Sequence, residues 1–259
     1  MTFTAPDYPV LFWITASIAV LLFGISKAGF AAGVGVLATP LVSLTVGVAE
    51  AAAILLPLLI VTDMLALFYY RRDFDKRSIK VLIPGGLAGI LLGALFFEFL
   101  KGRDDLLRLG IGTLALVFVA FQATRKIIFG TIQKHRPRLL EGLFMGTAGG
   151  FTSTIAHAGG PPVAIYLLPQ QLPKHIYVGT TAVFFAITNA VKLIPYGVLG
   201  LLRPGNLLTV FMLAPLTYIG VRLGVYLNRR VNEVWFMRLV YILLFFSGIQ
   251  LLWSGLMQK

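Results

Sequence analysis

Apolar residues form long runs along this chain, and charged residues gather in short stretches between them. Six runs have about 20 residues, the length that one helix needs to cross the hydrocarbon core of a bilayer. They cover residues 51–70, 81–100, 106–124, 176–196, 207–226 and 234–253. The pattern therefore predicts six membrane-spanning helices in an all-α polytopic membrane protein.

Two longer apolar stretches, residues 10–46 and 139–168, do not fit a single straight crossing. Both contain glycines and prolines near the middle, which predicts hairpins of shortened or discontinuous helices. Backbone freed at such a break must be buried in protein or line a wet cavity, because lipid offers it no hydrogen bonds.

The two breaks have related sequences. An offset of 121 pairs Gly29 with Gly150 and Pro40 with Pro161. Further matches at offsets of 126 to 131 are Thr62-Asp63 with Thr188-Asn189, Pro84, Gly89 and Gly93 with Pro215, Gly220 and Gly224, and Arg108-Leu109 with Arg238-Leu239. Offsets that change in loops and hold within helices favour duplication over chance. We expect a first repeat at 1–126, a cytoplasmic linker at 127–138 and a second repeat at 139–259, each repeat a broken-helix hairpin plus three spanning helices.

The composition supports a membrane protein and excludes several other classes. Apolar residues make up 58% of the chain and charged residues 12%, which leaves too little polar surface for a soluble domain. The net charge of +12 does not indicate nucleic-acid binding, because that function needs a basic face on a soluble domain. The absence of cysteine excludes disulfides and thiolate metal sites. The first basic residue is Lys27, so the first apolar run lacks the charged start of a cleaved signal peptide and is expected to remain.

The basic residues predict the orientation, since Lys and Arg are enriched in cytoplasmic loops. Fourteen of the 22 fall on one side: Arg71, Arg72, Lys76, Arg77, Lys80, Arg125, Lys126, Lys134, Arg136, Arg138, Lys174, Arg229, Arg230 and Arg238. Five fall on the other side: Lys101, Arg103, Arg108, Arg203 and Lys259. The loop at 71–80 then faces inward and its repeat partner around Arg203 outward, which predicts inverted repeats. We expect both termini to be external, in a bacterial-type inner membrane.

Apolar segments interrupted by Gly and Pro at matching places in two halves point to the substrate site of a transporter. The residues expected to contact the substrate are Lys27, Gly29, Gly33, Gly35, Thr39, Pro40, Thr152, Ser153, Thr154, His157, Gly159, Gly160, Pro161, Asn189 and Lys192.

Two lysines are candidates to bind an anion, because an ionisable group inside a membrane segment is costly. Lys27 could face an anion together with backbone N–H groups at the first break; alternatively it reaches a headgroup or pairs with Asp63. Lys192 shares a helical face with Asn189, three residues earlier, and the two could hold an oxyanion. The alternative is that Lys192 is an interfacial lysine.

The prolines at the breaks predict helix starts, since Pro is tolerated in the first helical turn. Helices that begin at Pro40 and Pro161 would point their positive ends at an anion, with Thr39 and Gly160 as caps. Hydroxyls of residues 152–154 would face these ends. The alternative for each glycine is that it only lets two helices pack closely.

Asp63 and His157 are the candidates for coupling transport to protons. Asp63 aligns with neutral Asn189 and is more simply explained as the counter-ion of Lys27. His157 titrates near neutral pH in water, yet a lone histidine is more often a satisfied core residue. Glu50 and Arg222 receive no role. We expect no metal, no cofactor and no catalytic residue, since neither ligand spacing nor a catalytic motif is present.

The glycine-rich openings, each followed by a proline about a dozen residues on, and Thr188-Asn189 with Lys192 resemble the TauE/SafE family of sulfite and organosulfonate exporters, also called the toluene-sulfonate uptake permease family. The resemblance covers essentially the whole chain. It implies secondary transport, as an exporter, of a small sulfur-containing anion such as sulfite, sulfoacetate or another sulfonate. At the same offset the second half has Thr154 where the first half has Gly33, and His157 where it has Val36, so the two half-sites are not equivalent.

Two other functions stay open at this point. A passive anion channel could use the same repeats, and a membrane enzyme, less favoured, could use His157 and the nearby hydroxyls. The expected partners are a small anion and the lipid bilayer, without nucleic acid; the sequence leaves a homodimer open.

Overall fold

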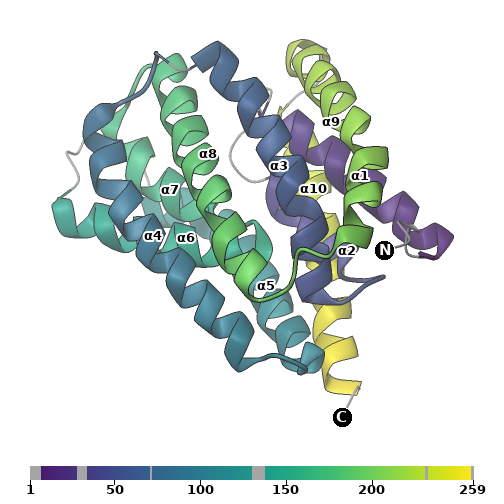
Figure 1. Cartoon of the computed structure of the whole chain (residues 1–259). Helices are drawn as coiled ribbons and strands as arrows, with labels where there is room; N and C mark the ends of the chain where they lie inside the picture. Colours follow the sequence, from purple (N-terminus) through teal and green to yellow (C-terminus); the bar gives the residue numbers. More distant parts are fainter. Residues whose placement is uncertain (1–6, 28–33, 71, 130–137, 231–232, 258–259) are drawn as a thin grey trace.

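The computed structural model describes residues 7–27, 34–70, 72–129, 138–230 and 233–257, and omits some side chains next to the gaps, including that of Lys27. Every regular element in these ranges is helical (Figure 1). The elements are α1 (Val10–Lys27), η1 (Val34–Leu37), α2 (Ala38–Val42), α3 (Val48–Tyr70), α4 (Lys76–Phe99), α5 (Asp104–Phe129), α6 (Leu139–Ala156), α7 (Gly160–Leu167), η2 (Leu168–Gln170), α8 (Lys174–Val198), α9 (Pro204–Arg230) and α10 (Glu233–Met257).

The six predicted spanning helices are confirmed. Among the described residues, α3, α4, α5, α8, α9 and α10 are long and apolar enough to cross a membrane. Large apolar side chains such as those of Phe68, Phe99 and Phe211 are exposed on their surfaces. Such exposure is unfavourable in water and expected in lipid, so the chain is a multi-pass membrane protein.

The predicted break in the second half is present as a discontinuous helix. In the second half α6 ends at Ala156 and α7 begins at Gly160, with His157 left-handed at φ 52° between them. In the first half α1 ends at Lys27, and the described chain resumes at Val34 in a 3-10 turn that leads into α2. The positions of the break residues 28–33, which include Gly29 and Gly33, lie outside the described residues.

The predicted helix caps are wrong. Thr39 and Gly160 lie within the first turns of α2 and α7, whose N-caps are Leu37 and Gly159. Proline tolerates any place in the first turn, because none of the first N–H groups has an intrahelical partner. Each helix therefore begins before its proline.

The two halves exchange their first helices. α1 packs against α9 of the second half, and α6 packs against α4 of the first half. The corresponding helices α3 and α8 pack against each other, as do α5 and α10. In Figure 1, α4, α6 and α7 lie on one side of α8, and α1 and α9 lie on the other side of α3. This reciprocal pairing is what two related halves would produce; their inversion stays a prediction.

Glycines bring the exchanged helices into backbone contact. A Cβ atom added at Gly89 of α4 would lie 2.0 Å from the carbonyl oxygen of Thr147 on α6. One added at Gly24 of α1 would lie 2.6 Å from the backbone of Gly220 on α9. Gly150 likewise meets the backbone of Gly86, so its place is explained by close helix packing.

Hydrogen bonds join the loops into two groups, one at each end of the helices. At one end, the backbone N–H of Asp75 donates to Thr180 Oγ1 at 2.8 Å. At the other end, Tyr8 donates to Glu50 at 2.7 Å and contacts Asn206 at 3.2 Å. This grouping agrees with the predicted topology, in which the loops at 71–80 and around Lys174 share one side and those around residues 101–105 and 198–205 share the other.

Candidate functional site

Lys192 on α8 is completely buried and points at the C-terminal end of α6. Its ammonium donates to the carbonyl oxygen of Ser153 at 2.9 Å, to Ser153 Oγ at 3.0 Å and to a ring nitrogen of His157 at 3.1 Å. The alternative of a lysine that reaches the membrane surface does not fit this burial. The sequence left the depth of Lys192 ambiguous because this residue lies near one end of the apolar run. In the fold, α8 packs against α3 and α4.

His157 connects Lys192 to the first half of the protein. An ammonium only donates, so the Nδ1 atom that contacts Lys192 accepts, and the ring proton of a neutral imidazole is on Nε2. Nε2 then donates to the carbonyl oxygen of Ala52 on α3 at 3.0 Å. Both ring nitrogens have partners, as expected for a satisfied core histidine.

α8 also caps the end of α6. The last carbonyls of a helix lack intrahelical partners, and cations are stabilised beside them. Lys192 bonds the carbonyl of Ser153, and the hydroxyl of Tyr196, one turn later on α8, donates to the carbonyl of Thr154 at 2.5 Å. The lysine thus has a structural role in addition to any part in anion binding.

Asp63 and Asn189 form a second buried pair. The side-chain amide of Asn189 on α8 donates to Asp63 Oδ2 on α3 at 2.5 Å. The Asn189 Oδ1 atom is buried and has no hydrogen-bond partner among the described residues. Asn189 therefore contacts α3 whereas Lys192 contacts α6, and the expected shared contact of the two with an oxyanion would require a rearrangement. The pairing of Asp63 with Lys27 concerns a side chain outside the described part.

The hydroxyls of the second break mostly bond their own helix. Thr152 donates to the carbonyl of Ala148 and Thr154 to that of Gly150, both at 2.8 Å. The oxygen of Ser153 faces Lys192. Gly159 approaches α6 so closely that an added Cβ would lie 2.6 Å from the carbonyl oxygen of Gly149.

The remaining candidates lie at the starts of the short helices. Gly35 is half-buried in η1, Thr39 and Pro40 are buried in α2, and Pro161 is buried in α7 beside half-buried Gly160. Thr39 Oγ1 has no partner in the described part of the chain.

Residues next to both breaks belong to one extended apolar cluster. Val36 and Leu37 from the start of the first short hairpin pack in the same buried cluster as Ala156 and Ala158 from the second break. Lys192, Ser153 and His157 lie beside the second break, at the end of α6.

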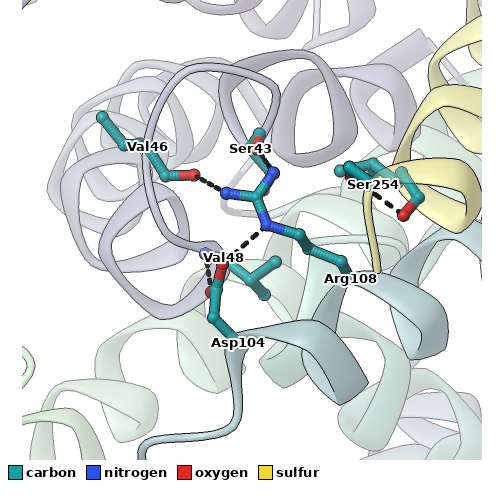
Figure 2. A network of polar contacts seen from close by, with 7 residues as sticks. Ser43, Val46, Val48, Asp104, Arg108 and Ser254 are labelled. Carbon is teal, nitrogen blue, oxygen red and sulfur yellow. Dashed lines mark hydrogen bonds and ion pairs between the residues drawn. The ribbon is translucent and has the colours of Figure 1, made fainter. Parts of the chain in front are cut away.

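A second polar network, which the sequence did not reveal, holds the connection between α2 and α3 (Figure 2). Arg108 on α5 donates to the carbonyls of Ser43 and Val46 at 3.1 and 3.4 Å and to Asp104 at 2.6 Å. Asp104 also accepts the N–H of Val48 at the start of α3, at 2.9 Å. The spacing of Asp104 and Arg108, four residues apart on a helix, was a signal for the ion pair but not for its backbone partners.

No group of three or more His, Cys, Asp or Glu residues that could hold a metal ion occurs in the described ranges. The chemistry available at the second break is a buried ammonium surrounded by small polar groups. Such an arrangement can exchange its internal acceptors for an anion.

Comparison with known proteins adds one finding. The sequence model of the family described as sulfite exporter TauE/SafE matches residues 16–251, nearly the whole chain. No curated protein and no solved structure matches.

Proposed function

This chain belongs to the sulfite exporter TauE/SafE family, and from that premise we propose that it exports a small sulfur-containing anion, such as sulfite, sulfoacetate or another sulfonate. Membership makes it a membrane transporter of the exporter type. The anion, the direction of transport and the use of a secondary, carrier mechanism are our proposal.

The observation that supports an anionic substrate is the buried ammonium of Lys192. The acceptors that contact it at 2.9 to 3.1 Å, from Ser153 and His157, are neutral. A sulfite or sulfonate oxygen carries negative charge and forms the stronger, charge-assisted hydrogen bond. An anion at the break between α6 and α7 would therefore displace an internal acceptor and form this stronger hydrogen bond with the lysine.

Alternating access between the two halves is the proposed mechanism. Each half contributes a broken helix, and the Ala52–His157–Lys192 chain joins α3 of the first half to α8 of the second. Relative movement of the halves would then change the hydrogen bonds of the lysine together with the access to it. Asp63 and His157 remain the candidates for any proton dependence.

Flux measurements in proteoliposomes test this proposal. We expect saturable transport and counterflow of at least one of sulfite, sulfoacetate or taurine. Lys192→Gln should lower the apparent affinity about 30-fold, the equivalent of roughly 2 kcal/mol for one charged hydrogen bond. Lys174→Gln, at the exposed start of the same helix, is the control and should transport normally.

Three results would contradict the proposal. Normal transport by the Lys192 variant would show that the anion site does not include Lys192. Non-saturable flux without counterflow would indicate a channel. Chemical conversion of the anion would indicate an enzyme.

A further inference from the structure

α9 has one packed face and one lipid-facing face. Its buried positions Leu213, Thr217, Gly220 and Gly224 recur every three or four residues, the repeat of one helix face, and α9 packs against α1 and α3. The opposite face is exposed and mostly apolar. Its large side chains are Phe211, Met212, Tyr218, Ile219, Leu223 and Tyr226.

Arg222 is a charged residue on this apolar face. It is exposed and lies within the segment Pro204–Gly224, which is long and apolar enough to cross the membrane. An arginine in a spanning segment costs about 2.5 to 3.5 kcal/mol at the bilayer centre, and less when its side chain reaches the headgroups. Arg222 lies near the end of the apolar run at residues 207–226, so a guanidinium on a long side chain reaches the headgroup level.

Two tyrosines flank Arg222 on the same face, at i−4 and i+4. The Arg222 Nε atom donates to the hydroxyl of Tyr218 at 3.0 Å, and the guanidinium lies 5.5 Å from the centre of the Tyr218 ring. Tyr218 and Tyr226 are 54% and 55% exposed. Tyrosine is enriched at the membrane–water interface, so three successive turns of α9 present interfacial groups.

The terminal nitrogens of Arg222 make no hydrogen bond within the described residues, since the contact to Tyr218 uses Nε. Their four N–H groups form a planar fork that matches two oxygens of one phosphate. An apolar environment on all other sides strengthens the attraction to such an anion. Water-soluble anions do not reach this face as readily as the headgroups of the surrounding lipids do.

We propose that Tyr218, Arg222 and Tyr226 form a binding site for the phosphate of an acidic phospholipid on the outer surface of α9. The guanidinium bonds the phosphate, Tyr218 holds the guanidinium in place, and the apolar residues of the face pack against the acyl chains. By the predicted topology this lipid belongs to the cytoplasmic leaflet. The site is separate from Lys192 and does not depend on which anion the protein transports.

Native mass spectrometry of the purified full-length protein tests the proposal, with phosphatidylglycerol as the probe and phosphatidylcholine as the neutral comparison. We expect wild type to retain phosphatidylglycerol preferentially, and Arg222→Gln to lower its apparent affinity about fivefold, the effect of one basic residue near a membrane surface. Arg203→Gln, an exposed arginine just before the same helix, should leave the affinity unchanged. Tyr218→Phe should weaken binding less than Arg222→Gln, because the charge remains.

Other results of the lipid-binding experiment would overturn the proposal or favour a different ligand for this face. Equal binding by wild type and Arg222→Gln, or equal losses in Arg222→Gln and Arg203→Gln, would overturn the proposal. Competition by millimolar inorganic phosphate at constant lipid would show a site for free anions instead. Conversion of a dimer to a monomer by Arg222→Gln would show that a second copy of the chain covers this face. Because the readout is lipid binding, a failed transport assay would not affect the result.

Discussion

At the scale of single residues, the fold buries the ammonium of Lys192 at the end of α6, where it has one structural role and one proposed role. Lys192 neutralises the carbonyl end of α6 and is proposed to hold the transported anion. Its position depends on Ser153, whose backbone and side-chain oxygens both accept from it, and on the left-handed backbone at His157, which turns the imidazole toward it. These contacts give the fully buried side chain of Lys192 three hydrogen-bond acceptors.

Removing the hydroxyl of Ser153 tests this support. Ser153→Ala deletes a hydrogen bond to a charged group, so we expect a loss of about 1.5 to 3 kcal/mol in the free energy of unfolding in mixed micelles. Thr124→Ala is the control, because its exposed hydroxyl bonds only carbonyls of its own helix. Equal stability of the two variants would show that the hydrogen bond to Lys192 contributes nothing measurable.

At the scale of the elements, close glycine contacts hold each first helix to the other half. Helices in lipid associate through van der Waals packing, which improves when small residues let backbones approach. Gly85 and Gly89 of α4 meet Gly146 and Thr147 of α6 in this way, and Gly24 of α1 meets Gly220 of α9. The exchanged helices therefore hold the two halves of the chain together.

A methyl group at Gly89 should loosen α4 from α6. Gly89→Ala places a Cβ against the carbonyl of Thr147, and overpacking of this kind costs about 1 to 3 kcal/mol. Gly197→Ala is the matched control: it is also a helical glycine, no atom lies within 4 Å of its added Cβ, and it should be neutral or slightly stabilising. Thermal unfolding of both variants in one detergent gives the comparison. Similar melting temperatures for the two would contradict the packing argument.

At the scale of the whole molecule, the hydrogen-bonded loops define two ends. The end with Asp75 and Thr180 belongs to the basic loops, and the end with Val48 and Asp104 belongs to the loops with fewer basic residues. The positive-inside rule then predicts that the first end is cytoplasmic.

Single cysteines in this cysteine-free chain test the orientation. We expect Lys101→Cys to react with a membrane-impermeant thiol reagent in intact cells, and Lys76→Cys to react only after permeabilisation. Both positions are exposed, so access to the side chain does not bias the comparison. Labelling of position 76 from outside intact cells would reverse the topology.

The sequence alone determined the membrane class, the six spans and the break in the second half. It could do so because lipid requires about 20 apolar residues per crossing and leaves the choice of helix unambiguous. Glycine and proline also act locally, because they interrupt a helix at the place where they occur. The caps at Thr39 and Gly160 were misplaced because proline fits several places in the first turn.

Only the tertiary structure decided which side chains meet. Lys192 bonds Ser153, which is 39 residues away in the chain, and His157 bonds Ala52, which is 105 residues away. These contacts depend on how the helices pack, which no local pattern specifies. The contacts of Arg108 with the backbone of the loop after α2 are also decided by the fold. Every residue has a backbone carbonyl, so the sequence does not mark which carbonyls accept from Arg108. Local propensity and hydrophobic length fix elements one at a time, whereas a site depends on contacts between elements that are distant in the chain.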